Sequence, residues 1–145
     1  PTGQSPSPGT GKEMAERICA KPPDMSILAV SVQVYAKPEI VAYVPRSSFW
    51  PVPEVDSAII KIPPNPPLAI YQLLHDRELY DKNFFRIVKA GFKSPRKQLI
   101  NNLSEGLNID RKQTERWLVS SRIDPKRRAE TLSVEEWEGL AKLSP

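Results

Sequence analysis

The sequence predicts an α+β protein in which a pair of short β-strands precedes a group of short α-helices. Residues 39–44 and 56–62 are rich in β-branched side chains and are bounded by prolines, which is typical of strands. From about residue 68 onward, apolar residues recur at helical spacing and helix-capping patterns follow one another. Between these two patterns, residues 63–67 (PPNPP) form a stiff spacer. We therefore expect two units that meet at this spacer.

Composition limits the kind of protein this chain can be. Its 145 residues suffice for one hydrophobic core or for two small units that share an interface. The single cysteine, Cys19, excludes an internal disulfide framework and has no His or Cys partner at metal-ligand spacing, so we expect no metal site. No apolar run approaches a membrane span, and the start of the chain lacks the regions of a signal peptide. We expect a soluble, cytoplasmic protein with no membrane partner.

The N-terminal third contains one weak motif and one ambiguous segment. Residues 1–11 are small, polar or proline, and we interpret them as a disordered leader or an expression remnant. The Gly-Thr-Gly-Lys sequence around their end lacks the first glycine and the Ser/Thr of a phosphate-binding loop, so it does not predict nucleotide binding. Residues 12–20 predict a helix with a buried Cys19 thiol. Residues 25–36 fit either a buried helix or a strand, because their length favours one and their β-branched residues the other.

The connection between the two predicted strands is longer and stiffer than a hairpin needs. Residues 45–55 (PRSSFWPVPEV) contain three prolines, which fix backbone angles and remove donors. Loops of this kind often hold a functional group in position. From the residues alone, Phe49 and Trp50 fit equally a stacking surface for a ligand and a plug at the end of the sheet.

The most basic stretch is residues 84–103, FFRIVKAGFKSPRKQLINNL, which has five basic side chains and no acidic one. Its spacing predicts a helix over about residues 82–93 whose apolar side carries Phe84, Phe85, Val88 and Phe92. A basic stripe on this helix consists of Lys82, Arg86, Lys89 and Lys93. Ser94-Pro95 predicts the start of a second helix with Arg96 and Lys97 in its first turn. Cations there oppose the helix dipole, and an anionic partner would relieve the conflict.

Charge is segregated along the chain. Residues 84–128 contain 12 basic and four acidic side chains, a net charge of +8, whereas the remainder has nine basic and 13 acidic, a net charge of −4. A merely solvated helix face would interleave Glu with Lys at i,i+4 spacing, and this stretch does not. We therefore predict a polyanion-binding surface. Its residues are Lys82, Arg86, Lys89, Lys93, Arg96, Lys97, Arg127 and Arg128.

The C-terminal part predicts four or five short helices. The pairs Asp110/Gln113 and Ser133/Glu136 have the spacing of capping boxes. Leu132 and Trp137 are placed for a hydrophobic staple over the second of these starts. Asp124-Pro125 predicts a further helix start that leads into the basic residues 126–128. His75, the one histidine, has no catalytic partners in the sequence, and we interpret it as an ordinary exposed residue.

Three segments together resemble one family. Residues 12–36 (KEMAERICAKPPDMSILAVSVQVYA), 44–62 (VPRSSFWPVPEVDSAIIKI) and 84–103, with the later IDPKRRAETLSVEEW, are similar to the rRNA adenine N6,N6-dimethyltransferases of the small ribosomal subunit. These enzymes depend on S-adenosylmethionine, and the erythromycin-resistance rRNA methyltransferases are their relatives. The second segment has the family's F-x-P-x-P-x-V-D-S-A pattern. The resemblance covers about residues 12–143.

The resemblance implies a fold and a domain division. Residues 12–63 would be the C-terminal part of a Rossmann-like methyltransferase domain, with residues 25–36 mostly helical and the two strands as its antiparallel edge. Residues 64–67 would be a linker, and residues 68–145 a small all-α, rRNA-binding domain. Residues 45–55 would be the target-base loop, in which Phe49 lies against the flipped adenine.

The family's cofactor-binding features do not occur here in their proper context. The chain has no glycine-rich first-strand loop with its acidic partner, and Asn65-Pro66-Pro67 is followed by leucine where the catalytic motif has an aromatic residue. We therefore expect an enzyme's C-terminal portion that binds no cofactor by itself, whereas the whole enzyme uses S-adenosylmethionine. Its expected partners are small-subunit rRNA and the immature small ribosomal subunit. The alternatives are a non-catalytic nucleic-acid- or ribosome-binding module with a helix-turn-helix, and a domain whose basic face meets an acidic protein.

Overall fold

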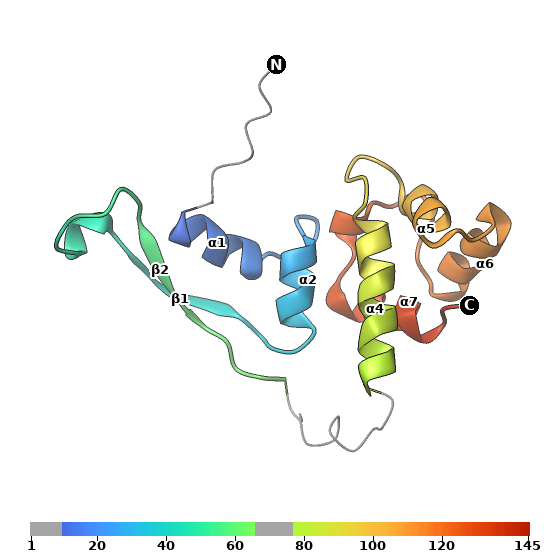
Figure 1. The fold of residues 1–145 in the computed structure, drawn as a ribbon, viewed down its shortest axis with the longest axis horizontal. Coiled ribbons are helices and arrows are strands. Elements are labelled where there is room, and N and C mark those ends of the chain that lie inside the picture. The colour runs from blue at the N-terminus through green and yellow to red at the C-terminus, as the bar shows by residue number, and fades with distance from the viewer. Residues whose placement is uncertain (1–9, 66–76) are drawn as a thin grey trace.

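The structure, a computed structural model, describes residues 10–65 and 77–145. Within these ranges it contains six α-helices and one two-stranded sheet, so the predicted α+β class is confirmed (Figure 1). The elements are α1 (Gly11–Ile18), α2 (Ile27–Gln33), β1 (Glu39–Val44), β2 (Ser57–Lys61), α4 (Arg77–Gly91), α5 (Leu99–Leu107), α6 (Arg111–Ser120) and α7 (Val134–Lys142), with the short 3-10 helices η1 (Arg46–Ser48) and η2 (Ala129–Thr131). The sheet lies at one end of the molecule and α5 and α6 lie at the other (Figure 1).

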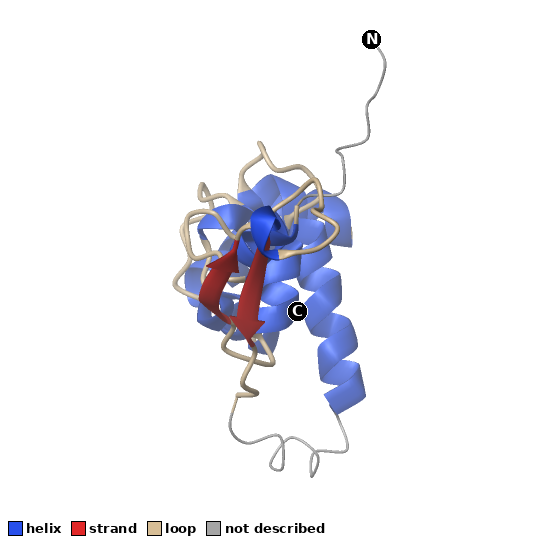
Figure 2. Cartoon of the chain, turned by 90° about the vertical axis from the view of Figure 1, so that its left-hand side faces the viewer, coloured by secondary structure: helices blue, strands red, loops and turns tan. Residues whose placement is uncertain are grey.

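The two strands form an antiparallel pair, as the resemblance implied. Glu39 pairs with Lys61 at one end and Val44 with Ser57 at the other, with an irregularity between Ile40 and Ala42. The strands run side by side in front of the helices when the molecule is seen from its sheet end (Figure 2). α1 lies against this sheet, because the Tyr43 hydroxyl donates to Glu16 Oε1 at 3.3 Å and the Lys12 ammonium lies 5.2 Å from the Tyr43 ring centroid.

Both N-terminal segments that the sequence analysis considered are helical. Thr10 caps α1 through a reciprocal capping box with Glu13, so the predicted leader cannot extend to residue 11, and residues 1–9 lie outside the described residues. Residues 25–36 contain α2, which begins where the Ser26 hydroxyl accepts from the Ala29 N–H, and the helical alternative is therefore correct. Cys19 is half-buried at the end of α1 rather than fully buried, and this partial burial, with the nearby Glu39 carboxylate, raises its pKa.

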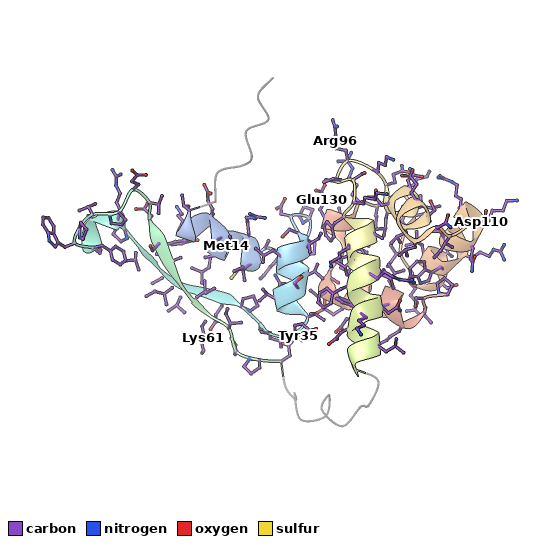
Figure 3. All side chains as sticks on the ribbon, viewed as in Figure 1. Met14, Tyr35, Lys61, Arg96, Asp110 and Glu130 are labelled. Atoms are coloured by element: carbon purple, nitrogen blue, oxygen red, sulfur yellow. The ribbon has the colours of Figure 1, made fainter. Side chains whose placement is uncertain are left out.

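One apolar core joins α2 to the C-terminal helices. Phe84, Val88 and Trp137 are its large buried members from α4 and α7, and Val30 of α2 belongs to the same cluster. Tyr35 lies between α2 and α4 (Figure 3), with its ring centroid 6.3 Å from that of Phe85. The two units expected from the sequence thus share buried contacts, and the division at residues 64–67 stays a prediction.

Pro63 and Asn65, at the start of the predicted linker, are hydrogen-bonded to residues near the end of α2. The Lys37 N–H donates to the Pro63 carbonyl at 2.9 Å, and the Asn65 N–H donates to the Tyr35 carbonyl at 2.8 Å. The Asn65 side-chain amide donates to the carbonyls of Gln33 and Val34. These bonds give Asn65 a structural role, while Pro66, Pro67 and His75 lie outside the described residues. In the described part of the chain, no helix is long and apolar enough to span a membrane.

Candidate nucleic-acid interface

The candidate interface has three parts, and the first is the solvent side of α4. Phe84 and Val88 are buried on its other side, as predicted, together with Ile87, which was not predicted, whereas Phe85 and Phe92 are only partly buried. Lys82, Arg86 and Lys89 all have exposed side chains. Lys82 and Arg86 also line an open hollow of about 630 Å³ beside the start of this helix. The basic stripe therefore borders a concave part of the surface.

The second part is a turn between α4 and α5, where the sequence prediction was wrong about both helix boundaries. α4 ends at Gly91 rather than at residue 93, and α5 begins at Leu99 rather than at Ser94. Asn102 of α5 explains the turn: its buried Nδ2 donates to the carbonyls of Gly91 at 2.7 Å and Ser94 at 3.0 Å. The first bond satisfies a carbonyl that the end of α4 leaves unpaired, and the second adds to the bond that the Ser94 carbonyl accepts from the Lys97 N–H. Lys93, Arg96 and Lys97 are consequently exposed on a turn that α5 holds in place, and Figure 3 shows Arg96 pointing away from the molecule.

A third segment, residues 124–128, meets this turn at the start of α5. The Leu99 N–H donates to the Arg127 carbonyl at 2.7 Å, and the Ile100 N–H donates to the Pro125 carbonyl at 3.3 Å. Asp124-Pro125 therefore begins no helix; the Asp124 carboxylate instead accepts from the Lys126 N–H in a tight turn. The start of α5 also offers fewer free N–H groups than the sequence implied, because these carbonyls occupy two of them. The anion-binding role of that helix start is thus not supported.

The two arginines of this segment differ in what they do. The Arg127 guanidinium binds the Glu136 carboxylate with two hydrogen bonds of 2.5 and 3.0 Å, and it also donates to Thr131. These bonds are the main reason that the pKa of Glu136 is lowered. Arg127 thus anchors the segment to the start of α7, which is itself closed by the predicted Ser133/Glu136 capping box. Arg128 is exposed, and its guanidinium is loosely paired with the Glu130 carboxylate at 3.9 Å.

The remaining basic residues differ in their neighbours. Lys97 forms an ion pair of 3.0 Å with Glu105, and this hydrogen bond lowers the pKa of that carboxyl group. Within residues 10–65 and 77–145, Arg86, Lys89, Lys93 and Arg96 have no ion-pair partner. Uncompensated charges of one sign on adjoining segments produce a positive potential that attracts anions. RNA contact by each of the eight predicted residues remains a prediction.

Sequence reasoning overlooked basic residues that the structure places nearby. Lys126 is exposed in the same turn as Arg128. Arg111, Lys112 and Arg116 are exposed on α6, one helix away from the turn that carries Arg96. The signal for the α6 residues was present, because Lys112 and Arg116 stand four residues apart on a helix whose cap was predicted correctly at Asp110.

The loop between the strands carries the predicted base-contacting residue. Residues 45–56 are closed at the base by the Arg46 N–H, which donates to the Asp56 carboxylate at 2.9 Å. Phe49 is 43% exposed and Trp50 is 95% exposed, so Trp50 does not plug the sheet. A large aromatic side chain with this exposure is free to receive another planar group.

The described residues offer no place for S-adenosylmethionine or a metal ion. Their glycines, at positions 11, 91, 106 and 139, all lie in helices, and none follows a strand as in a dinucleotide-type loop. Among the same residues, no three His, Cys, Asp or Glu side chains form a potential metal-binding group.

An α+β fold with a segregated, exposed basic surface is typical of nucleic-acid-binding proteins. The chain belongs to the ribosomal RNA adenine dimethylase family, whose model matches residues 10–144. This finding confirms the resemblance drawn from the three sequence segments.

Curated relatives extend well beyond the region they share with this chain. The ribosomal RNA small subunit methyltransferase A of Dehalococcoides mccartyi is 44% identical over 129 residues, which are 89% of this chain and 42% of that protein. The protein of the same name from Desulfitobacterium hafniense is 39% identical over 133 residues, which are 90% of this chain and 45% of that protein. The chain thus spans less than half the length of the curated relatives it matches.

Two solved structures have a similar fold. A dimethyladenosine transferase from Plasmodium falciparum has a TM-score of 0.65 and 24% identity, over 90% of this chain and 53% of that one. The 23S rRNA methyltransferase ErmE has a TM-score of 0.62 and 23% identity, over 90% of this chain and 50% of that one. The α+β architecture is therefore one found within methyltransferase structures.

Proposed function

We propose that this chain is the RNA-docking portion of an enzyme that dimethylates adjacent adenines of small-subunit rRNA. The methyl donor of the whole enzyme would be S-adenosylmethionine. Family membership and the names of the curated relatives support this function. The observation that carries it is the convergence of exposed cations without an ion-pair partner on α4 and the turn after it, represented by Arg86, Lys89 and Arg96, with Lys93 near Glu105. Such cations would bind phosphates and orient the RNA, whose folded shape would provide selectivity.

In this proposal the two parts of the chain have separate tasks. Residues 12–63 would complete one edge of a Rossmann-like methyltransferase sheet, residues 64–67 would link, and residues 68–145 would form the rRNA-binding domain. The exposure of Val41 and Ile59, at 59% and 53%, supports a sheet that packs against further protein. The cofactor would bind to that further protein, because the described residues contain no suitable loop.

Phe49 would form one wall of the pocket for the target adenine. Enzymes that modify a base take it out of its stack and hold it against apolar or aromatic side chains. The exposure of Phe49 at the end of a stiff, proline-rich loop supports this role. The immature small ribosomal subunit would be the whole enzyme's partner, and the cytoplasm its location.

A second candidate is a non-catalytic nucleic-acid- or ribosome-binding module. The arrangement of α5, a turn at residues 108–110 and α6 favours it, because two short helices joined by a three-residue turn also occur in DNA-binding proteins. A competition binding experiment distinguishes the two candidate functions. Structured RNA should displace labelled small-subunit rRNA from this chain far better than duplex DNA with the same number of phosphates.

The proposed docking surface is tested by the salt dependence of RNA binding. Replacing Arg86, Lys89 and Lys93 with Gln removes three phosphate contacts, so the slope of log K against log salt should fall by about 2–3 units. Binding of transcribed small-subunit rRNA is measured by fluorescence anisotropy at several salt concentrations. The matched control replaces Arg17, Lys21 and Lys37 with Gln, which changes charge equally at exposed positions outside the surface. Equal slopes for both variants and the parent would show that the basic side chains of α4 are solvated and do not bind RNA.

A further inference from the structure

The side of α6 that faces solvent carries basic side chains that take no part in packing the core. Thr114, Trp117 and Leu118 are buried on the inner side, and the Trp117 indole donates to the Leu140 carbonyl at 2.9 Å, which attaches α6 to α7. At helical spacing, Lys112, Arg116 and Val119 lie opposite these residues, and all three are exposed. This side of α6 therefore presents two cations and one aliphatic side chain to solvent, with the exposed Glu115 beside them.

Arg111 connects this face to the turn that carries Arg96. Its guanidinium donates to the Asn101 side-chain carbonyl on α5. Asn101 and Glu105 are one helical turn apart, and Glu105 holds Lys97 at 3.0 Å. Two basic areas, residues 93–97 and α6, thus lie on either side of α5, whose own solvent side carries Asn101 and Glu105 and no basic residue. In Figure 3, Arg96 and Asp110, the cap of α6, both lie toward the upper side of the helical part.

The three basic charges on α6 exceed the two carboxylates beside them, Asp110 and Glu115. Residues 111–128 contain seven basic and two acidic side chains, and Glu115 is the single acidic residue of α6. In the described part of the chain, Arg111, Lys112 and Arg116 form no ion pair. Three exposed cations within two helical turns make a local site for a polyanion.

We propose that Arg111, Lys112 and Arg116 of α6 form a second RNA-backbone contact, which binds phosphates next to those held by α4 and its turn. This inference rests on the proposed function and extends its docking surface by one helix. Phosphate contact fits better than base reading, because Lys is a point charge and Val119 has no polar group. The deep, narrow major groove of A-form RNA also excludes a helix that would enter that of DNA.

The test compares two Gln variants of the full chain with the same transcribed small-subunit rRNA. Lys112→Gln with Arg116→Gln should weaken binding and lower the salt slope by about 1.4–1.8 units, the value for two phosphate contacts. Arg17→Gln with Lys37→Gln, which removes one Arg and one Lys far from α6, should leave the slope unchanged. Equal thermal unfolding midpoints for all variants would show that the fold is retained, as expected for exposed side chains.

The outcomes separate this inference from the proposed function. Parental affinity and slope in the α6 variant, with a reduced slope in the variant of Arg86, Lys89 and Lys93, would overturn the α6 contact and leave the docking surface on α4. Parental slopes in both variants would overturn both proposals. If the α6 variant lost affinity for duplex DNA or for an acidic protein while it bound RNA like the parent, α6 would serve that other partner, and the RNA contact would be wrong.

Discussion

At the scale of single residues, exposure separates side chains that maintain the fold from side chains available to a partner. Arg127 and Arg128 are adjacent, but Arg127 is held by Glu136 and Thr131, whereas Arg128 is solvated and only loosely paired. The sequence alone assigned both to RNA. A bidentate, half-buried arginine is better explained by its role in holding residues 124–128 against α7.

Phe49 provides a prediction at this scale. In the intact enzyme, Phe49→Ala should lower the methylation rate by roughly tenfold or more while RNA affinity changes little, because the ring would engage only the extruded base. Base–aromatic stacking contributes about 1–3 kcal/mol, and its loss would slow the reaction by this factor. Single-turnover methylation and RNA binding are measured side by side.

The structural alternative for Phe49 predicts a different pattern. If the ring served only to close the sheet, Phe49→Ala would lower the thermal stability of the protein and leave the methylation rate of the folded fraction unchanged. Trp50→Ala is a useful comparison, because a residue that is 95% exposed contributes little to folding.

At the scale of elements, the start of α5 organises the interface. Asn102 closes the end of α4 and the turn that follows it, and the N–H groups of Leu99 and Ile100 hold residues 125–127. Two basic segments about 30 positions apart in the chain are therefore fixed to one helix end. Their relative position depends on these hydrogen bonds and on the Arg127–Glu136 pair, which attaches residues 124–128 to α7.

Replacing Asn102 with Ala tests this arrangement. Loss of its amide leaves the Gly91 carbonyl without its side-chain donor, while the Ser94 carbonyl keeps the Lys97 N–H. The free energy of unfolding should therefore fall by about 1–3 kcal/mol. Chemical denaturation monitored by circular dichroism gives the value. Asn101→Ala, on the solvent side of the same helix, should cost less than about 1 kcal/mol. Similar losses in the two variants would mean that Asn102 does not organise the turn.

At the scale of the whole molecule, the described residues carry exposed basic side chains but no glycine-rich loop of the kind that binds a methyl donor. We expect that this chain alone neither binds S-adenosylmethionine at micromolar concentration nor methylates small-subunit RNA. The reason is that every glycine in the described residues lies in a helix, so no loop can cradle the cofactor. Calorimetric titration and transfer of radiolabelled methyl groups are the measurements. A micromolar dissociation constant in the titration would contradict the expectation.

The local features of this protein were predictable from its sequence because they depend on neighbouring residues. β1 has the predicted bounds, and Ser133/Glu136 form the predicted capping box, whereas periodicity left residues 25–36 open between the helix that forms and a strand. The segregation of charge is likewise a property of the sequence and persists in any fold. By contrast, Ser94-Pro95 and Asp124-Pro125 have the residue types of helix starts but form turns. The same local signals are compatible with both conformations.

Only the tertiary structure decided which of these turns meet and which cations remain available. Residues 93–97 and 124–128 lie together because Leu99 and Ile100 bond to carbonyls far along the chain. Arg127 is paired with Glu136, and Arg111 joins α6 to α5 through Asn101, because the fold brings these residues together. The sequence determined the helices and strands and the positive charge of the surface, because hydrophobic periodicity and charge are properties of short stretches of sequence. The arrangement of that surface follows from core packing and backbone hydrogen bonds between distant residues, which no short stretch of sequence encodes.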